Sequence, residues 1–297
     1  MLVRTLAVLI AVAIAACANR TAPIDRAIEA TFPAQPATAE LARQLRVVTY
    51  NVHREPGSKI IHAIESSPEL RAADLILLQE VHRDERSLVT CSGACALGKR
   101  LGYHTIYAPG HNQDYGSDGV AILSRAPITS AQVIELPYFD VRFNSGRRVA
   151  VAATLVVDGT PITVYAVHLD NRLTVADRRT QMQPVLEHAR RQPTPVIIAG
   201  DFNTSPFTWI GGVFPILTTT QDNHLEQLVR SYGFATPVVA SGSTHRYLPM
   251  KLDAIYTRGF DVTSFATSDA ARVSDHRALW ARLQYRHDDE LPASSGP

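Results

Sequence analysis

The sequence predicts an α/β fold whose strands end in polar side chains. Two apolar runs, DLILLQE (74–80) and PVIIAGDFNTSP (195–206), have the length of buried strands, and each leads into carboxylate or amide residues. Segments with the apolar spacing of amphipathic helices lie between such runs, and Arg172–Arg191 is the clearest of them. The 297 residues are 45% hydrophobic and show no internal repeat, which favours a single large domain.

The first residues have the pattern of an export signal. Arg4 precedes the apolar run Leu6–Ala16, which is too short to span a bilayer but suits a secretory signal core. The run ends at Cys17 in a pattern that resembles the lipobox of bacterial lipoproteins, which implies a signal peptide at 1–16 and lipidation of Cys17. Ordinary cleavage after Ala18 is the alternative, and it would give a secreted or periplasmic protein.

Lipidation would place the protein in the bacterial cell envelope. Ala18, directly after the cysteine, favours the outer membrane, and residues 17–44 are then expected to be a tether between membrane and domain. The full chain has a formal net charge of +1, and loss of the single basic residue within 1–16 leaves a neutral mature chain. A nonspecific nucleic-acid binder usually carries a strong positive bias, so only a local basic patch around Arg142, Arg147 and Arg148 remains open.

The two remaining cysteines are Cys91 and Cys95. They are too few for a structural zinc site, and no further cysteine or histidine cluster follows at ligand spacing. In an exported protein we expect a local disulfide, with two buried thiols as the alternative. A helix between them would put the Cα atoms near the upper limit for a disulfide, so a loop or distorted turn is expected there.

The expected domain runs from residue 45 to residue 285, and its first two strands each end in a polar residue. Leu45–Val52 (LRVVTYNV) is rich in strand-forming residues and delivers Asn51. Ser58–Ser66 has helical spacing, and Asp74–Glu80 is a second buried strand that delivers Glu80. A solvated glutamate at a strand end is the alternative for Glu80.

Two pairs of strands follow. The first pair is joined by a loop that contains Tyr115, and the second is a hairpin around the strong turn signal Asp158-Gly159; the strands are Gly102–Pro109, Asp118–Arg125, Arg148–Val157 and Pro161–Leu169. The last strand brings His168, with Asp170 two positions later on the same face of an extended chain. This spacing suits an oriented imidazole, although a satisfied core histidine is the commoner fate of a lone one.

The stretch Pro195–Pro206 is the next strand and delivers Asp201 and Asn203. An aspartate that merely caps the next turn is the alternative for Asp201. The apolar residues that follow could form a lip beside the site or belong to the core; they are Phe207, Trp209, Ile210 and Phe214.

The C-terminal part repeats the pattern. A helix at Gln221–Tyr232 is stopped by Gly233, and Asp253 lies in the expected strand Lys251–Thr257. Asp275 and His276 precede the last of two further strands, which are Phe260–Thr267 and Ala278–Tyr285. Residues 286–297 are expected to be a disordered tail.

These polar residues together suit metal-assisted phosphate chemistry. Glu80, Asn51 and Asp275 offer oxygen ligands for a hard cation. Such ligands suit Mg²⁺, with Mn²⁺ as the alternative. Donors to phosphate oxygens are available from His168, Asn203 and His276, whereas Asp253 and Asp201 can orient an imidazole or a water molecule.

The polar residues belong to six short motifs, which are TYNV (49–52), LQE (78–80), VHLD (167–170), GDFN (200–203), LDAI (252–255) and SDH (274–276). In these motifs and their order the chain resembles, over about 45–285, the endonuclease/exonuclease/phosphatase superfamily, the family of pancreatic deoxyribonuclease. The resemblance implies a four-layered α/β/β/α sandwich of two mixed β-sheets flanked by helices. At least nine expected strands with helices between them are compatible with that fold.

The resemblance also implies a role for each matching residue. Glu80 is similar to the principal metal ligand, with Asn51 and Asp275 beside it. His276 resembles the general base, and it is paired with Asp253. The remaining roles implied are a water-orienting Asp201, a phosphate-holding pair of Asn203 and His168, and support from Asp170, which could bind Arg178 or backbone of the following helix.

The expected function is that of a metal-dependent phosphoesterase, most readily a phosphodiesterase that cleaves P–O bonds by in-line attack of water. Its partner would be a phosphoester substrate, and the fold family does not select one. A neutral, tethered chain favours a lipid headgroup of the sphingomyelin or phosphoinositide type, or a small phosphodiester, and a DNA or RNA endonuclease is the alternative. A catalytically silent envelope lipoprotein that binds a phosphorylated ligand is the other alternative, but every motif residue is present. We expect a monomer.

Overall fold

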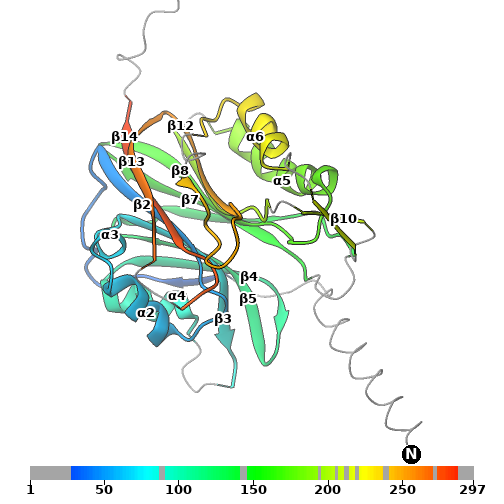
Figure 1. Cartoon of the computed structure of the whole chain (residues 1–297). Coiled ribbons are helices and arrows are strands. Elements are labelled where there is room, and N and C mark those ends of the chain that lie inside the picture. The colour runs from blue at the N-terminus through cyan, green and yellow to red at the C-terminus, as the bar shows by residue number, and fades with distance from the viewer. Residues whose placement is uncertain are drawn as a thin grey trace, which may run out of the picture.

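The structure is a computed structural model in which two β-sheets pack face to face between helices (Figure 1). It describes residues 28–86, 91–140, 146–192, 195–204, 207–210, 214–217, 221–236, 241–269 and 273–286. The signal peptide, Cys17 and the tail from residue 287 lie outside these residues. Within them, no helix is long and apolar enough to cross a membrane.

The first sheet has seven strands and carries three helices on its outer face. Its order is β1 (Glu29–Thr31), β4 (His104–Gln113), β5 (Gly116–Ser124), β3 (Leu75–Asp84), β2 (Gln44–Asn51), β14 (Ala278–Tyr285) and β13 (Phe260–Ser268). The helices are α2 (Gly57–Glu65), α3 (Pro68–Arg71) and α4 (Gly93–Leu101). β2 and β3 are parallel, so both strands end at the same edge of the sheet, with Asn51 opposite Gln79.

The second sheet has five strands and is covered by two helices. Its order is β12 (Asp253–Arg258), β9 (Val196–Asp201), β8 (Thr160–His168), β7 (Val149–Val157) and β6 (Ser130–Glu135). The helices are α5 (Val175–Arg190) and α6 (Gln221–Ser231), and a separate hairpin is formed by β10 (Phe207–Ile210) and β11 (Phe214–Leu217). In this sheet Asp201 lies opposite both His168 and Asp253, so the register alone sets three polar residues side by side.

Three apolar clusters hold the layers together. The largest lies between the sheets and includes Val47, Leu77 and Ile197. A second cluster fills the space between the first sheet and α2 and α4, and a third joins the second sheet to α5 and α6. The four-layered sandwich predicted from the sequence is confirmed, because each sheet buries one face against the other sheet and one against helices.

Most predicted strands and helices are present with small shifts of their ends, but several elements were missed. The missed elements are β1, β6, α3, α4 and the β10–β11 hairpin, and most of them are short. The predicted loop around Tyr115 is also much shorter than expected, because β4 continues to Gln113 and β5 starts at Gly116. The polar residues His111 and Gln113 suggested a loop, yet both are buried within a strand.

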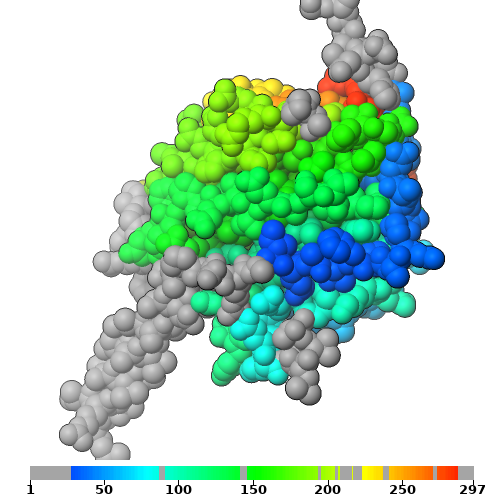
Figure 2. Space-filling view, turned by 180° about the vertical axis from the view of Figure 1, so that it is seen from behind, coloured from blue at the N-terminus to red at the C-terminus, as the bar shows by residue number. Residues whose placement is uncertain are grey.

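The predicted tether at 17–44 is wrong for the part that the structure describes. Glu29–Thr31 pairs with β4 as an edge strand, and Leu41 is buried in the cluster between the two sheets. Figure 2 shows this blue N-terminal segment lying along the surface of the domain. Backbone pairing and burial of an apolar side chain offset the entropy of ordering the segment, so any tether ends before residue 28.

Cys91 and Cys95 form a disulfide with a Cα separation of 5.6 Å. Cys91 lies outside α4, whose N-cap is Ser92, and Cys95 lies in the first turn. The Ser92 hydroxyl accepts from the Cys95 N–H and donates to a carboxylate oxygen of Glu29 at 2.6 Å. The disulfide region therefore also anchors the N-terminal segment.

Gly200 allows strand β9 to pack closely against strand β8, and any side chain at this position is expected to disturb that packing. A Cβ at this position would lie 1.9 Å from the carbonyl oxygen of Val167 on the neighbouring strand, and backbone cannot move aside cheaply. Gly200→Ala should therefore lower the free energy of unfolding by about 2–3 kcal/mol in a urea titration. As a control, Gly159→Asn in an open turn should lower it by less than about 1 kcal/mol, because asparagine tolerates the positive φ of 75° there. An unchanged urea midpoint in Gly200→Ala would show that the two strands can separate locally.

Candidate active site

A cavity of about 410 Å³ opens where β2 and β3 of one sheet end beside β8, β9 and β12 of the other. Residues from nearly all the predicted motifs line it; they include Glu80, His168, Asp201, Asn203, Asp275 and His276. Asn51 and Asp253 lie directly behind this wall, in contact with Asp201 and His276. The two sheets thus contribute to a single site.

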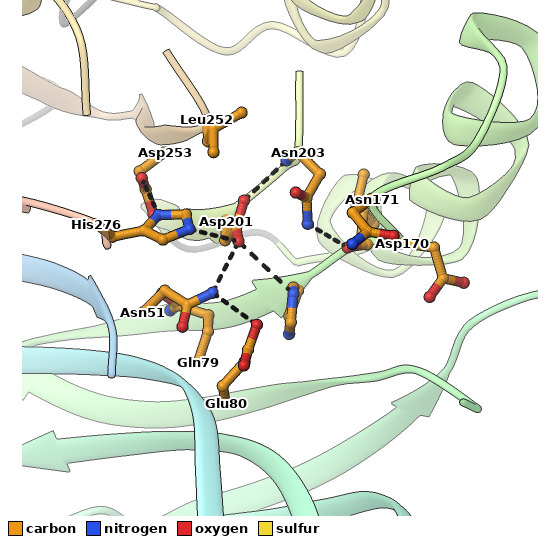
Figure 3. Close-up of polar contacts among 12 residues, drawn as sticks. Asn51, Gln79, Glu80, Asp170, Asn171, Asp201, Asn203, Leu252, Asp253 and His276 are labelled. Carbon is orange, nitrogen blue, oxygen red and sulfur yellow. Dashed lines mark hydrogen bonds and ion pairs between the residues drawn. The ribbon is translucent and has the colours of Figure 1, made fainter. Parts of the chain in front are cut away.

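Asp201 is the centre of the polar network (Figure 3). Its Oδ2 accepts from Asn51 Nδ2 at 2.9 Å, and its Oδ1 accepts from the backbone N–H of Asn203 at 2.9 Å. The same Oδ2 lies 3.6 Å from His168 Nε2 and 3.7 Å from His276 Nε2. Burial raises the pKa of Asp201 to about 7, although the neighbouring His276 opposes this shift.

His276 is held by Asp253. A carboxylate only accepts, so the 2.9 Å contact with Asp253 Oδ2 places a proton on His276 Nδ1 and turns Nε2 toward Asp201. Burial acts to lower the pKa of His276, but Asp253 and Asp201 outweigh it and raise the pKa to about 10. Asp253 Oδ1 is buried without a hydrogen-bond partner among the described residues.

Glu80 reaches the site through an irregularity in β3. The register of β3 with β5 shifts between Leu78 and Val81, and Glu80 itself has a φ of 52°. Its Oε1 accepts from Asn51 Nδ2 at 3.2 Å, and Arg54 Nε lies 3.4 Å from Oε2. The distorted backbone thus turns the carboxylate away from the regular alternation of the strand.

His168 is oriented by Arg148, which in turn is held by Asp170. Arginine only donates, so the 3.0 Å contact from Arg148 Nη1 makes His168 Nδ1 an acceptor and leaves the proton on Nε2, facing Asp201. Burial, assisted by Arg148, lowers the pKa of His168 well below its usual value. Arg148 Nε donates to Asp170 Oδ1 at 2.8 Å, so Asp170 orients the imidazole through an arginine.

Asp170 is also tied to the following helix. Its Oδ2 accepts from Gln181 Nε2 at 2.9 Å, whereas Arg178 contacts the backbone carbonyl of Asp170 at 3.3 Å. The carboxylate thus binds Arg148 and Gln181, and Arg178 binds the backbone carbonyl of the same residue. Asn203 donates through Nδ2 to the carbonyl of Leu169 at 2.8 Å, which leaves its second amide hydrogen available.

Several residues at the site were not predicted. Asp118 is buried, its Oδ1 has no hydrogen-bond partner in the described ranges, and His111 Nε2 lies 3.9 Å from its Oδ2. Burial, followed by the charge of Glu80, raises the pKa of Asp118 to about 7. Arg54 and His245 also line the cavity. The sequence did contain a signal for Asp118, because this polar residue begins the strand predicted at 118–125.

The donor atoms of this site suit a hard divalent cation. Ligand atoms of Asp201, Asp253 and His276 lie within 4.8 Å of one another, and buried carboxylates without full compensation favour a positive ion. The predicted ligands are placed differently. Asn51 Oδ1 accepts from the His53 N–H at 3.0 Å, so Asn51 would have to turn its amide over to bind a cation. The half-buried carboxylate of Asp275 lines the same cavity.

Comparisons with known proteins bear on the family and on the fold. A model of the endonuclease/exonuclease/phosphatase family matches residues 48–276. No curated protein is similar enough in sequence to match. The crystal structure of an endonuclease/exonuclease/phosphatase from Beutenbergia cavernae DSM 12333 is 22% identical, with a TM-score of 0.66 over 82% of this chain and 72% of that chain.

Two further solved structures share the fold at lower identity. The human Nocturnin catalytic domain with bound sulfate is 19% identical, with a TM-score of 0.58 over 87% of this chain and 97% of that one. ANGEL2, a 2',3'-cyclic phosphatase, in complex with adenosine-2',3'-vanadate is 14% identical, with a TM-score of 0.53 over 90% of this chain and 100% of that one. At these identities the likeness concerns the fold.

Proposed function

The chain belongs to the endonuclease/exonuclease/phosphatase family, and from this premise we propose that it is a metal-dependent phosphoesterase. The observation that carries the proposal is the convergence of two imidazoles on one buried carboxylate oxygen. His168 Nε2 and His276 Nε2 both lie within 3.7 Å of Asp201 Oδ2 at the wall of the cavity. Such an arrangement can hold a water molecule against a bound phosphate and move a proton from it.

His276 is the proposed general base. Its Nδ1–H is fixed on Asp253, so only Nε2 can take a proton from water, and Asp201 lies beside that nitrogen to orient the water. The charges of Asp253 and Asp201 raise the pKa of the ring to about 10, so they favour the imidazolium that forms when Nε2 takes the proton.

The opposite wall of the site is proposed to hold the phosphate. His168 directs Nε2–H into the site because Arg148 occupies its other nitrogen. Asn203 uses one amide hydrogen on the carbonyl of Leu169, no acceptor for the second is found among the described residues, and its backbone is fixed by the bond to Asp201. Both are donors aimed at a region where a phosphoryl oxygen would gain negative charge during attack.

Glu80, with Asp275 and a turned Asn51, is proposed to hold Mg²⁺ or Mn²⁺. When bound, the cation supplies Lewis-acid polarisation of the phosphoryl oxygens. Glu80 fits this role because its carboxylate lines the cavity and is only partly satisfied by Asn51 and Arg54. Asp201, Asp253 and His276 are already linked to one another, and they serve better as the water-activating group.

Removal of divalent cations should abolish hydrolysis. EDTA should stop turnover, and Mg²⁺ or Mn²⁺ should restore it. Glu80→Gln keeps the size but removes the charge, so the cation concentration for half-maximal activation should rise at least about tenfold. Mg²⁺ should also raise the melting temperature of the wild type and have little effect on that of the variant.

The matched control for this test is Glu65→Gln. Glu65 pairs with Arg100 on the outer helices, far from the motif residues, so its activation curve should equal that of the wild type. Full activity in EDTA, or a Glu80→Gln variant with the same cation requirement, would contradict the proposed ligand role.

A phosphodiester is the preferred substrate class. The neutral charge of the mature chain is unlike that of a nonspecific nuclease, which supports a lipid headgroup or a small phosphodiester. Nucleic acid is the alternative. Among proteins of this fold, the Nocturnin structure contains bound sulfate and the ANGEL2 structure contains adenosine-2',3'-vanadate. The experiment is an assay of residues 19–297 with Mg²⁺ against an activated phosphodiester, DNA, RNA, sphingomyelin and inositol phosphates. Absence of hydrolysis of every substrate would favour the silent phospholigand-binding lipoprotein.

Anchoring through Cys17 is a further part of the proposal. In a bacterial host, Cys17→Ser should move the full chain from the membrane fraction to the soluble fraction, because a lipid chain would no longer be attached. Labelling with a fatty-acid analogue should be lost in the same variant. Cys91→Ser is the control and should leave the labelling unchanged. A wild-type chain without label would support ordinary cleavage after Ala18 and a secreted or periplasmic protein.

A further inference from the structure

The loop from Ser243 to Met250 stands over the cavity in a conformation fixed by its own hydrogen bonds. The backbone N–H groups of Thr244 and His245 both donate to the carbonyl of Met250 at 3.0 Å. Ser243 Oγ lies within 3.0 Å of three carbonyl oxygens, including those of Leu248 and Met250. Because His245, Leu248 and Met250 all line the cavity, this loop presents a preformed surface to a ligand.

His245 has its proton fixed on one nitrogen by this loop. The backbone N–H groups of Tyr247 and Leu248 donate to its Nδ1 at 3.2 and 3.0 Å. A nitrogen that accepts two amide hydrogens carries no proton, so the proton of the neutral ring lies on Nε2. The orientation and the tautomer of the ring are thus determined before any substrate arrives.

The Nε2–H of His245 has no acceptor within hydrogen-bond distance among the described residues. The nearest carboxylate oxygen, Asp275 Oδ2, lies 3.9 Å away, which is too long for a hydrogen bond. The side chain is only 12% exposed, so the ring is largely held within the wall of the cavity. Its ring centroid lies 6.2 Å from that of His276, and the two residues are joined by a backbone bridge. A partly buried, oriented donor is therefore left facing the proposed reaction site.

We propose that His245 is a further substrate-contacting residue, whose Nε2–H donates a hydrogen bond to an oxygen of the phosphoester held in the cavity. The inference rests on the proposed phosphoesterase function. It adds a third imidazole to His168 and His276, supplied by a loop and not by a strand end. Since the loop has already fixed the ring, the hydrogen bond forms without a cost for ordering the side chain.

Two substitutions separate this role from a purely structural one. His245→Asn keeps an acceptor close to the position of Nδ1, so the loop stays capped, but it removes the Nε2–H. His245→Gln places an amide N–H near the position of Nε2 and loses the cap. With Mg²⁺ and an activated phosphodiester, kcat/KM of the Asn variant should fall roughly 10- to 100-fold at an unchanged melting temperature. The Gln variant should recover part of that loss although it melts at a lower temperature.

The control is His62→Asn, the same substitution at an exposed position of α2, which should leave kcat/KM within about twofold of the wild type. Wild-type kcat/KM in His245→Asn would overturn the inference. A Gln variant that is no more active than the Asn variant would also overturn it. So would a loss of activity in His245→Asn that is accompanied by a melting temperature as low as that of the Gln variant.

The result remains distinguishable from a failure of the proposed function. If the wild type hydrolyses no substrate, the phosphoesterase proposal fails, and the contact is then tested by calorimetric titration of inorganic phosphate in the presence of Mg²⁺. The wild type should bind phosphate more tightly than His245→Asn by roughly tenfold or more. Equal affinities would overturn the inference for His245 as well.

Discussion

Replacement of His276 by alanine is expected to lower kcat/KM for phosphoester hydrolysis by about 10³-fold, within the range for loss of a general base. The imidazole is the only group bonded to Asp253 Oδ2 that also reaches Asp201, so no neighbouring side chain can replace it in the described site. KM should change much less than kcat, because His276 acts mainly on the attacking water. Steady-state kinetics at saturating Mg²⁺ would measure both.

The loss in His276→Ala must be separated from misfolding. The variant leaves Asp253 buried without its partner, so the melting temperature should be measured alongside activity. His62→Ala, at an exposed position of α2, should retain full activity. Hydrolysis at the wild-type rate by a folded His276→Ala protein would exclude His276 as the base and with it the proposed mechanism.

Asp201→Asn is expected to lower kcat by about 10²- to 10³-fold while the fold is kept. The single amide oxygen can still accept from the Asn203 N–H in the place of Oδ1, although the bond that Oδ2 accepts from Asn51 is lost, and a buried neutral amide costs less than a buried carboxylate. The variant loses the negative charge beside both imidazoles, so it can no longer orient the water or balance the charge of His276. A melting temperature within a few degrees of the wild type should accompany the loss of turnover.

Asp261→Asn serves as the matched control for Asp201→Asn. Asp261 lies on the exposed side of β13 and pairs only loosely with Arg286, at 3.5 Å, so its substitution should change neither kcat nor KM. Equal kcat values for Asp201→Asn and the wild type would show that turnover does not need the negative charge of Asp201.

Local sequence patterns were sufficient for the regular elements and for the polar residues at their ends. Short apolar runs such as Val196–Gly200 are typical of strands that are buried on both faces, and this run is buried throughout. The polar residues that follow, Asp201 and Asn203, reach the cavity because parallel strands end at a common edge. The same patterns failed where a strand carries buried polar residues, as at His111 and Gln113.

The sequence by itself determined the α/β architecture, the family resemblance and most residues around the cavity, because these depend on local periodicity and short motifs. Only the tertiary structure decided that Asn51 and Asp201 are bonded across 150 positions, that Arg148 links His168 to Asp170, and that Asp118 and His245 face the same cavity. Residues 28–44 likewise pack on the domain instead of forming a tether. Such contacts join elements of different sheets and loops, and their energies depend on burial and charge in the folded protein, which no local pattern encodes.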